Sequence, residues 1–249
     1  MSVDREVVLE ALSALLETTV KPYNGTSNPN ELNTQNFLEK GLLKQFADRF
    51  NSMQQAPVAG FNSDVRDEMF VDMDEFFDPR FGYDFTHSDK SVYMRGNEQY
   101  KRPSGWYRIA LKVLDKYPNG NAWLGTKGRR THSVAGEWPV SYHGTSVDGA
   151  TGIVKTHYKA GPRQLYGRGI YSTHDIDQAY GYSKEFTSKK TGKRYRVLMQ
   201  NRINPEMRKV CQRRSDYWLI EIPEGTSADQ EKEIVEKSIR PYGILLKEV

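Results

Sequence analysis

The sequence predicts a mixed fold of helices and strands, in which helices dominate the first hundred residues. Two observations support this prediction. Before residue 80, apolar residues recur at helical spacing in three segments, whereas after Trp106 apolar and polar residues alternate as they do in a half-buried strand. The change of period follows an irregular, aromatic stretch over 80–104. We therefore expect an acidic, mainly helical N-terminal region over 1–104 and a second domain over 105–249.

Three helices are expected in the N-terminal region. Residues 4–20 place four apolar side chains on one stripe, and Lys21-Pro22 ends the pattern. A polar connector follows over 23–33, and further helical spacing covers about 34–53 and 62–78. The stripe of the first helix could dock on the second domain or on a partner. The Met and Phe residues of the third helix are typical of core packing.

Short strands are expected in the second domain, at 106–113, 138–142, 169–173, 194–201, 217–222 and 239–247. Ser146 is a suitable N-cap for a helix that extends to about residue 156, and another helix is expected over 176–186. The segment 123–136 is rich in lysine and arginine and is expected to be a basic loop. Such a loop is either solvated or in contact with phosphates.

The composition indicates a folded protein of a reducing compartment. Of the 249 residues, 37% are hydrophobic and 12% are aromatic, which is enough to bury a core. The single cysteine, Cys211, excludes a disulfide framework and a cysteine-based metal cluster. No secretory signal and no apolar stretch of membrane-spanning length is visible in the sequence. We therefore expect an intracellular protein, cytoplasmic or nuclear, without a membrane partner.

The charges are divided unevenly between the two regions. Residues 1–100 contain 9 Lys and Arg against 17 Asp and Glu, whereas the other 149 residues contain 27 against 15. A basic region suits the pyrophosphate of a dinucleotide or a nucleic acid, and an acidic region beside it could screen that surface. The alternative is a solvated surface on which the charges are unevenly placed.

Three short motifs follow one another in the second domain. They are Tyr142-His143-Gly144-Thr145, then Gly167-Arg168-Gly169-Ile170-Tyr171-Ser172-Thr173, then Ala179-Tyr180-Gly181-Tyr182. Tyr171 and Tyr182 are eleven residues apart. In this order and at this spacing, the motifs resemble the NAD-binding core of the diphtheria-toxin and poly(ADP-ribose)-polymerase class of ADP-ribosyltransferases. A Rossmann fingerprint does not fit, because it needs a third glycine where Ser172 stands.

The resemblance covers roughly residues 105–249 and implies a fold and a cofactor. The implied fold is α+β, with two small antiparallel sheets that face each other around an NAD cleft and with the helical N-terminal region outside it. NAD is the implied substrate. No metal is expected, since the sequence has no cluster of His, Cys and acidic residues at metal-ligand spacing.

The resemblance also assigns roles to individual residues. His143 would hydrogen-bond a ribose hydroxyl, while Tyr171 and Tyr182 would hold the nicotinamide ring between two aromatic faces. Gly144 would let the backbone approach the carboxamide, because it has no Cβ. An arginine on the loop between the motifs could pair with the pyrophosphate. The full set expected to contact NAD is His143, Gly144, Thr145, Arg163, Tyr171, Ser172 and Tyr182.

The third catalytic position departs from the family. The family has a glutamate at the start of a later strand, where it offsets the charge of an oxocarbenium-like transition state. Here Asp216 stands in that place, one methylene shorter, and it is followed by Tyr217 and apolar residues. The alternative is that Asp216 pairs with Arg213 or Arg214 at the surface, and that the enzyme then either lacks the acid or takes it from Glu221. The expected catalytic residues are His143, Tyr171 and Asp216.

The activity that the resemblance implies is NAD-dependent mono-ADP-ribosyl transfer. Such an enzyme cleaves the nicotinamide glycosidic bond and passes ADP-ribose to a macromolecular acceptor, more commonly a protein than a nucleic acid. Loss of the glutamate in this family often accompanies mono- rather than poly-ADP-ribosylation. Two other activities fit the same motifs: a module that binds NAD or ADP-ribose without turnover, and an NAD glycohydrolase that uses water as acceptor.

Overall fold

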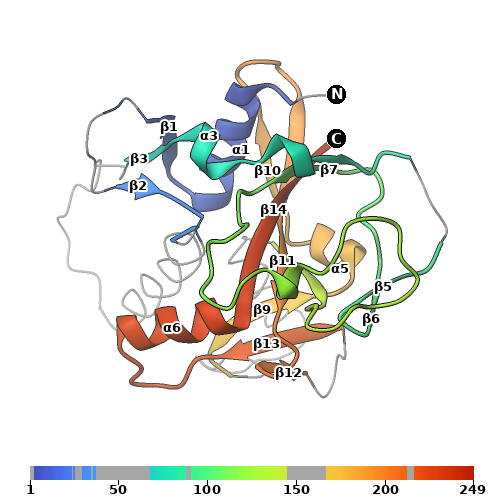
Figure 1. Cartoon of the computed structure of the whole chain (residues 1–249). Helices are drawn as coiled ribbons and strands as arrows, with labels where there is room; N and C mark the ends of the chain where they lie inside the picture. The colour runs from blue at the N-terminus through green and yellow to red at the C-terminus, as the bar shows by residue number, and fades with distance from the viewer. Residues whose placement is uncertain are drawn as a thin grey trace, which may run out of the picture.

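The computed structural model describes residues 3–23, 25, 30–34, 36–37, 68–87, 91–144, 167–211 and 216–249. This part of the chain is an α+β structure with mostly antiparallel sheets, as the sequence predicts (Figure 1). Its helices are α1 (Arg5–Leu16), α3 (Met73–Phe76), α5 (Ile176–Tyr180) and α6 (Ala228–Ser238), with 3-10 helices η2 (Pro79–Phe81) and η3 (Ala122–Leu124). Its strands are β1 (Thr19–Pro22), β2 (Glu31–Leu32), β3 (Glu68–Val71), β4 (Tyr83–Asp84), β5 (Tyr93–Arg95), β6 (Glu98–Tyr100), β7 (Tyr107–Ala110), β8 (Val140–His143), β9 (Gly169–Thr173), β10 (Lys184–Thr187), β11 (Arg194–Ile203), β12 (Arg208–Val210), β13 (Tyr217–Glu221) and β14 (Ile239–Glu248).

Within the described residues, one nine-stranded sheet dominates the structure. Its strand order is β12-β13-β9-β8-β11-β14-β7-β4, and β10 pairs with β11 beside this path. The longest ladder joins β11 and β14, which pair over residues 195–203 with a bulge between Gln200 and Asn201. Most residues of both strands are buried, and apolar residues of both strands share the main hydrophobic core with α1.

The sheet is narrowest where β8 meets β9. In the part of the chain that the structure describes, these two strands pair only at Tyr142 and Thr173, whereas β9 pairs with β13 along its whole length. The sheet therefore has a short part, β12-β13-β9, and a long part, β8-β11-β14-β7-β4, which meet at one residue pair. The resemblance implied two separate sheets, and the structure instead has one sheet with this narrow junction.

The N-terminal helix belongs to the core of the large sheet. Asp4 caps α1 by accepting a hydrogen bond from the backbone N–H of Glu6 at 2.8 Å. The helix buries six apolar residues in the same cluster as residues of β11 and β14. Strand β4 likewise pairs with β7 in the large sheet. Of the two alternatives for α1, docking on the second domain is observed. Residues on both sides of the expected boundary at residue 104 pack together in this core and pair in this sheet.

Two of the expected N-terminal helices differ from the structure. The first ends at Leu16, because Glu17 adopts a left-handed conformation (φ 51°) and the β-branched residues after it form β1. Within its described part, the helix expected over 62–78 is found only at Met73–Phe76, since residues 68–71 form a strand. There, β3 pairs in parallel with β1, and Asp72 then caps the short helix α3 with its carboxylate. The expected helix over 34–53 lies almost entirely outside the described residues.

In the second domain, the expected strands are found as β7, β8, β9, β11, β13 and β14, with shifted ends. The helix expected over 176–186 ends at Tyr180, and residues 184–187 form β10 instead. The irregular stretch over 80–104 contains a hairpin, β5-β6, whose turn residues Gly96 and Asn97 have φ of 57° and 62°. The helix expected from Ser146 lies outside the described residues.

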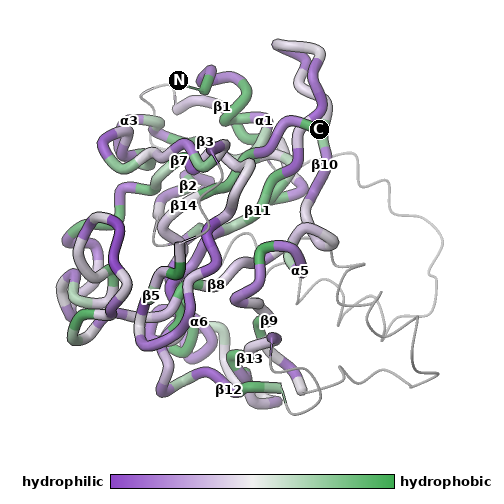
Figure 2. The backbone as a smooth tube through the Cα atoms, turned by 90° about the vertical axis from the view of Figure 1, so that its right-hand side faces the viewer, coloured by the Kyte–Doolittle hydropathy of each residue, from purple (hydrophilic) through white to green (hydrophobic). Residues whose placement is uncertain are grey.

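The hydropathy of the chain agrees with the position of this core. Figure 2 shows apolar segments on α1 and β11 in the interior and hydrophilic segments on the outer loops. In the described ranges, no helix is both long and apolar enough to cross a membrane.

Candidate functional site

His143 lies at the narrow junction, at the carboxyl end of β8. Its Nδ1 is 2.5 Å from the carbonyl oxygen of Tyr171 on β9. Because a carbonyl oxygen only accepts, Nδ1 carries the hydrogen, and Nε2 of the neutral ring is left as an acceptor. Burial lowers the pKa of His143, and the hydrogen bond to Tyr171 opposes this only in part. The imidazole is therefore neutral at pH 7, with its acceptor nitrogen turned away from Tyr171.

Gly144 makes the next contact along the chain. A Cβ at this position would overlap the backbone carbonyl and Cβ of Tyr182, so only glycine fits. The contact brings the end of β8 against the turn that follows α5. Gly144 was expected to admit the backbone of a bound cofactor. In the structure, the space that its missing side chain leaves is taken by the backbone of Tyr182.

Tyr171 and Tyr182 pack against the same small cluster, whose buried members are Cys211, Tyr217 and Leu219. The hydroxyl of Tyr171 donates to the carbonyl oxygen of Gly167 at 2.6 Å. Both tyrosines are half-buried, so their rings are fixed by packing but keep exposed area. The structure thus brings together the two tyrosines that the spacing of eleven residues singled out.

Tyr217 fixes the ring of Tyr182 through a chain of hydroxyl groups. Its hydroxyl donates to Oε1 of Gln178 at 3.2 Å and accepts from the hydroxyl of Tyr182 at 3.0 Å. The rings of Tyr182 and Tyr217 are edge to face, with centroids 6.4 Å apart. Sequence reasoning missed the roles of Tyr217 and Gln178. Their spacing of four would place Gln178 and Tyr182 on one face of the helix expected over 176–186, but that helix ends at Tyr180.

Asp216 precedes β13 directly and is half-buried. Burial raises the pKa of the Cys211 thiol, Lys209 lowers it, and the charge of Asp216 raises it further. Asp216 directly precedes Tyr217, a member of the tyrosine cluster. Glu221, the alternative acid, is at the other end of β13, where it is exposed and 3.7 Å from Nζ of Lys209. Of the two acids, Asp216 is the one that is adjacent in the chain to a cluster residue.

Ser172 lies on the other face of β9 from Tyr171. It is opposite Trp218 in the register with β13, whereas Tyr171 is opposite Leu219. Its side chain is buried, and its Oγ has no hydrogen-bond partner in the described residues. The alternation of side chains along β9 thus separates Ser172 from the tyrosine cluster. Thr145, Arg163, Arg213 and Arg214 lie outside the described residues.

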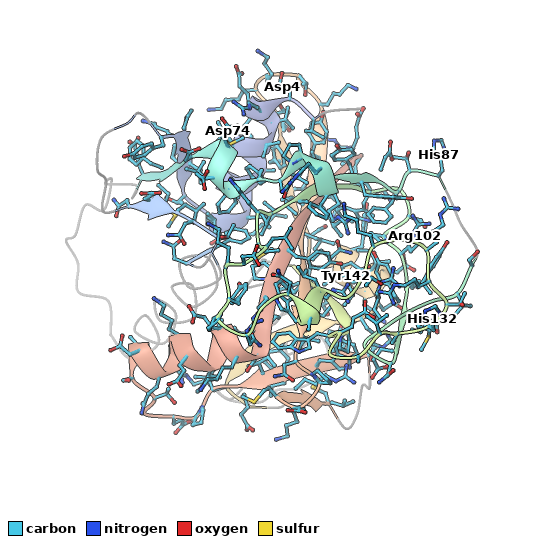
Figure 3. The ribbon with its side chains drawn as sticks, viewed as in Figure 1. Asp4, Asp74, His87, Arg102, His132 and Tyr142 are labelled. Atoms are coloured by element: carbon cyan, nitrogen blue, oxygen red, sulfur yellow. The ribbon has the colours of Figure 1, made fainter. Side chains whose placement is uncertain are left out.

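Lys101 ties the two motif elements together from outside the motifs. Its carbonyl oxygen accepts a hydrogen bond from the hydroxyl of Tyr142 at 2.7 Å. Its ammonium group contacts Asp175 at 3.1 Å and Asp177 at 2.6 Å, at the start of α5. One residue thus anchors both the strand that delivers His143 and the helix that precedes Tyr182. Tyr142 is labelled among the interior side chains in Figure 3.

Comparisons with known proteins add no assignment to this geometry. The chain matches no family model, and no curated protein matches it significantly. In the ranges that the structure describes, no group of three or more His, Cys, Asp and Glu residues could hold a metal ion.

Proposed function

We propose that the protein is an NAD-dependent mono-ADP-ribosyltransferase whose NAD site is the narrow junction of the sheet. The observation that carries the proposal is that contacts link His143 to Tyr171 and Gly144 to Tyr182 beside the residue pair that, in the described ranges, joins β8 and β9. These four residues come from all three motifs of the resemblance. In the sequence, the two most distant of them, His143 and Tyr182, are 39 residues apart.

The state of each group suits the chemistry proposed for it. Neutral His143 presents Nε2 as an acceptor, which is what a ribose hydroxyl requires of a partner. Tyr171 and Tyr182 offer aromatic faces that are already fixed at their hydroxyl ends, so binding a flat ring costs little side-chain entropy. The nicotinamide ring is proposed to lie against one or both of these faces.

In the proposed reaction the bond between ribose C1 and the nicotinamide nitrogen breaks. Nicotinamide leaves with the electron pair, and the ribose becomes oxocarbenium-like. The carboxylate of Asp216 is proposed to stabilise this positive charge. The nucleophile of the acceptor then attacks C1 and loses its proton. The proposed acceptor is a macromolecule of the cell interior, with a protein side chain ahead of a nucleic acid.

A second candidate function is a module that binds NAD or ADP-ribose without turnover. The observation in its favour is the acid itself, because aspartate is one methylene shorter than the glutamate of the family. A displacement of about 1 Å can reduce a rate on the order of 10²-fold. The position of Asp216 directly before Tyr217 of the tyrosine cluster favours the enzyme.

The test is nicotinamide release from NAD by the purified chain, with and without cell extract as a source of acceptors. Wild-type protein is compared with Asp216→Asn, Tyr182→Ala and the matched control Glu221→Gln. Transfer predicts release that only the first two variants lose, together with ADP-ribose label on the extract. Release without labelling supports the glycohydrolase. NAD binding without release supports the binding module, and the absence of both rejects the proposal.

A further inference from the structure

Four arginine side chains are buried beside the long part of the large sheet. Arg95, Arg130, Arg202 and Arg240 have exposed fractions of 8%, 9%, 5% and 4%. Burial of a cation is costly unless an acid is paired with it. Within the described residues, the first three share one carboxylate, that of Glu137, and Arg240 forms no ion pair with any of the described acids. The buried positive charge therefore exceeds the buried negative charge.

Arg240 lies at the start of β14, directly after α6 (Figure 1). In the register of β14 with β11 it is opposite Arg202, and like charges directly opposite each other are destabilising. The two guanidinium groups also reach the same segments. Arg202 donates to the carbonyl oxygens of Trp138 at 2.5 Å and Leu124 at 2.6 Å, and Cζ of Arg240 lies 4.6 Å from the ring centroid of Trp138. The charge of Arg240 thus adds to that of Arg202.

Aromatic rings surround the guanidinium of Arg240. Its Cζ lies 4.0 Å from the ring centroid of Tyr117 and 5.2 Å from that of Trp123, in addition to the contact with Trp138. Ring faces attract a cation, but they carry no net charge that would neutralise it. Burial lowers the pKa of Arg240, and Tyr117 and Glu236 oppose this only in part. A guanidinium nevertheless stays protonated in proteins, so the buried charge persists.

Three buried N–H donors at this place have no hydrogen-bond partner. Nε of Arg240 donates to the carbonyl oxygen of Glu236 at 2.9 Å, but its Nη1 is unpaired. Nε1 of Trp123 and Nε of Arg202 are unpaired as well. None of these groups can accept a hydrogen bond, and each buried donor without an acceptor destabilises the fold. Residues of β14, η3 and β11 therefore all require an acceptor, where positive charge is in excess.

We propose that Arg240, Arg202 and Trp123 bind a small inorganic anion of the halide class. Such an ion accepts from several N–H groups at once and offsets positive charge, so it meets both requirements. An acidic side chain of a partner protein or a nucleic-acid phosphate brings its own backbone with it and cannot reach a guanidinium that is 4% exposed. A single-atom ion needs the smallest opening.

This inference goes beyond the proposed function and does not depend on it, because the anion site and the candidate NAD site consist of different residues. The two are connected through β8. Arg202 is opposite Val140, at the start of the strand that ends at His143. A bound anion would therefore stabilise the part of the sheet from which His143 extends.

The test follows thermal unfolding of the full chain while sodium gluconate is replaced stepwise by sodium chloride. The ionic strength is held constant, so general screening does not change. Chloride that binds the folded chain raises Tm in the way a ligand does, and the dependence gives an apparent Kd. Trp123→Phe keeps a ring but removes the N–H, and it is expected to weaken this Kd about tenfold.

Arg240→Met removes the buried charge and keeps apolar contact with the rings. This variant is expected to lose the response to chloride and to be at least as stable as wild type in gluconate, since an apolar residue needs no counterion. The matched control is Arg194→Gln, at an exposed arginine that is paired with Glu185. It is expected to keep the wild-type response.

A direct readout is the anomalous signal of bromide in crystals of the full chain, with a peak expected at Nη1 of Arg240. Three outcomes would overturn the inference: a Tm of wild type that does not change with chloride, an equal loss of response in Arg194→Gln, and bromide bound only at exposed residues. An unchanged response in folded Arg240→Met would also do so. Should that variant not fold, Trp123→Phe and the bromide peak decide.

Discussion

The two parts of the large sheet differ in how they are held together. In the long part, β11 and β14 pair through backbone hydrogen bonds along nearly their full length. At the junction of β8 and β9, a single residue pair remains, and the carbonyl of Tyr171 accepts from the side chain of His143 instead of from a strand. The difference shows what happens where strand pairing ends. A backbone carbonyl that has no partner strand is bound by a side chain, and the rest of that side chain can contact other groups.

The buried polar groups follow the same division. In the long part, the carboxylate of Glu137 forms ion pairs with three arginines. Its Oε1 lies 2.5 Å from a guanidinium nitrogen of Arg130, 3.4 Å from one of Arg202 and 3.6 Å from one of Arg95. The short part holds its tyrosines with neutral hydroxyl groups. The ionic cluster lies just before β8 and fixes the direction in which that strand enters the sheet. Each prediction below tests one side of this comparison.

The largest effect is expected at Glu137. Glu137→Ala leaves three arginines around a site without its carboxylate, so the free energy of unfolding should fall by about 3–5 kcal/mol. Urea unfolding of the variant measures this. Glu224→Ala, at an exposed position, serves as control and should stay within about 0.5 kcal/mol of wild type. A loss of less than about 1 kcal/mol in Glu137→Ala would show that these ion pairs do not stabilise the fold as proposed.

Acid should weaken the two parts in different pH windows. The folded pKa of His143 is lowered from 6.5, so the unfolded chain takes up the proton first, and stability falls as the pH drops below about 6.5. For Glu137, burial raises the pKa, but Arg130 and Arg202 lower it more, to below 4.5. Its stabilisation is present above about pH 4.5 and is lost as the pH falls through the folded pKa.

Unfolding measured from pH 8 to pH 3 should therefore show two successive losses. His143→Gln should remove the first loss and leave the second, because Gln does not titrate. If the His143 variant keeps the wild-type profile, the neutral state assigned to the junction is wrong. NAD binding should weaken at lower pH than the start of the first loss, as the pH falls through the folded pKa of His143, since protonation of the folded ring removes the acceptor at Nε2.

A smaller effect is expected at Tyr217. Tyr217→Phe removes the hydroxyl between Tyr182 and Gln178 and leaves the ring packing in place. Loss of this link should raise KM for NAD about fivefold, on the order of 1 kcal/mol, with kcat nearly unchanged. Tyr195→Phe is the matched control, since the hydroxyl of Tyr195 makes only a long contact of 3.5 Å with that of Thr191. An equal rise in KM in both variants would assign the effect to general destabilisation.

The smallest effect is expected at the contact of α1 with the β10–β11 hairpin. Glu6 and Lys190 form an ion pair at 3.3 Å with both side chains about half exposed or more. Glu6→Gln should change the free energy of unfolding by less than about 0.5 kcal/mol. Leu12→Ala in the buried face of the same helix should cost about 2–5 kcal/mol. Urea unfolding of the pair separates the packing of α1 from its charges.

Some of this structure could be predicted from the sequence because it depends on local patterns. The alternation after Trp106 and the motif around Tyr171 gave β7 and β9. The helix expected over 62–78 is a strand at residues 68–71, because pairing of β3 with β1, far away in the sequence, outweighs the helical spacing of Met and Phe residues there. The same holds for Ser172, whose face of β9 is set by the register with β13.

The candidate site also combines residues that local patterns identify with residues that depend on distant contacts. His143, Tyr171 and Tyr182 were identified because motif order and spacing survive in the sequence, although the activity assigned to them stays a prediction. Tyr217 was noted only as the neighbour of Asp216, since its role depends on a hydroxyl contact with Tyr182 across 35 residues of chain. The arginines around Glu137 come from β5, the 125–131 loop and β11, and no local pattern relates them.

The most direct test of the account is calorimetric titration of NAD into three proteins: wild type, Gly144→Ala and Gly181→Ala. A Cβ at Gly144 would overlap the backbone of Tyr182, whereas one at Gly181, in right-handed helical conformation, meets only the carbonyl of Gln178 at 3.6 Å. Tyr182→Ala, on the other side of the first contact, is a second variant should Gly144→Ala fail to fold.

We predict that wild type and Gly181→Ala bind NAD with the same Kd, and that Gly144→Ala and Tyr182→Ala bind at least about tenfold more weakly, the equivalent of about 1.4 kcal/mol. Wild-type affinity in folded Gly144→Ala, or no binding of NAD by the wild-type chain, would contradict the assignment of the junction as the NAD site.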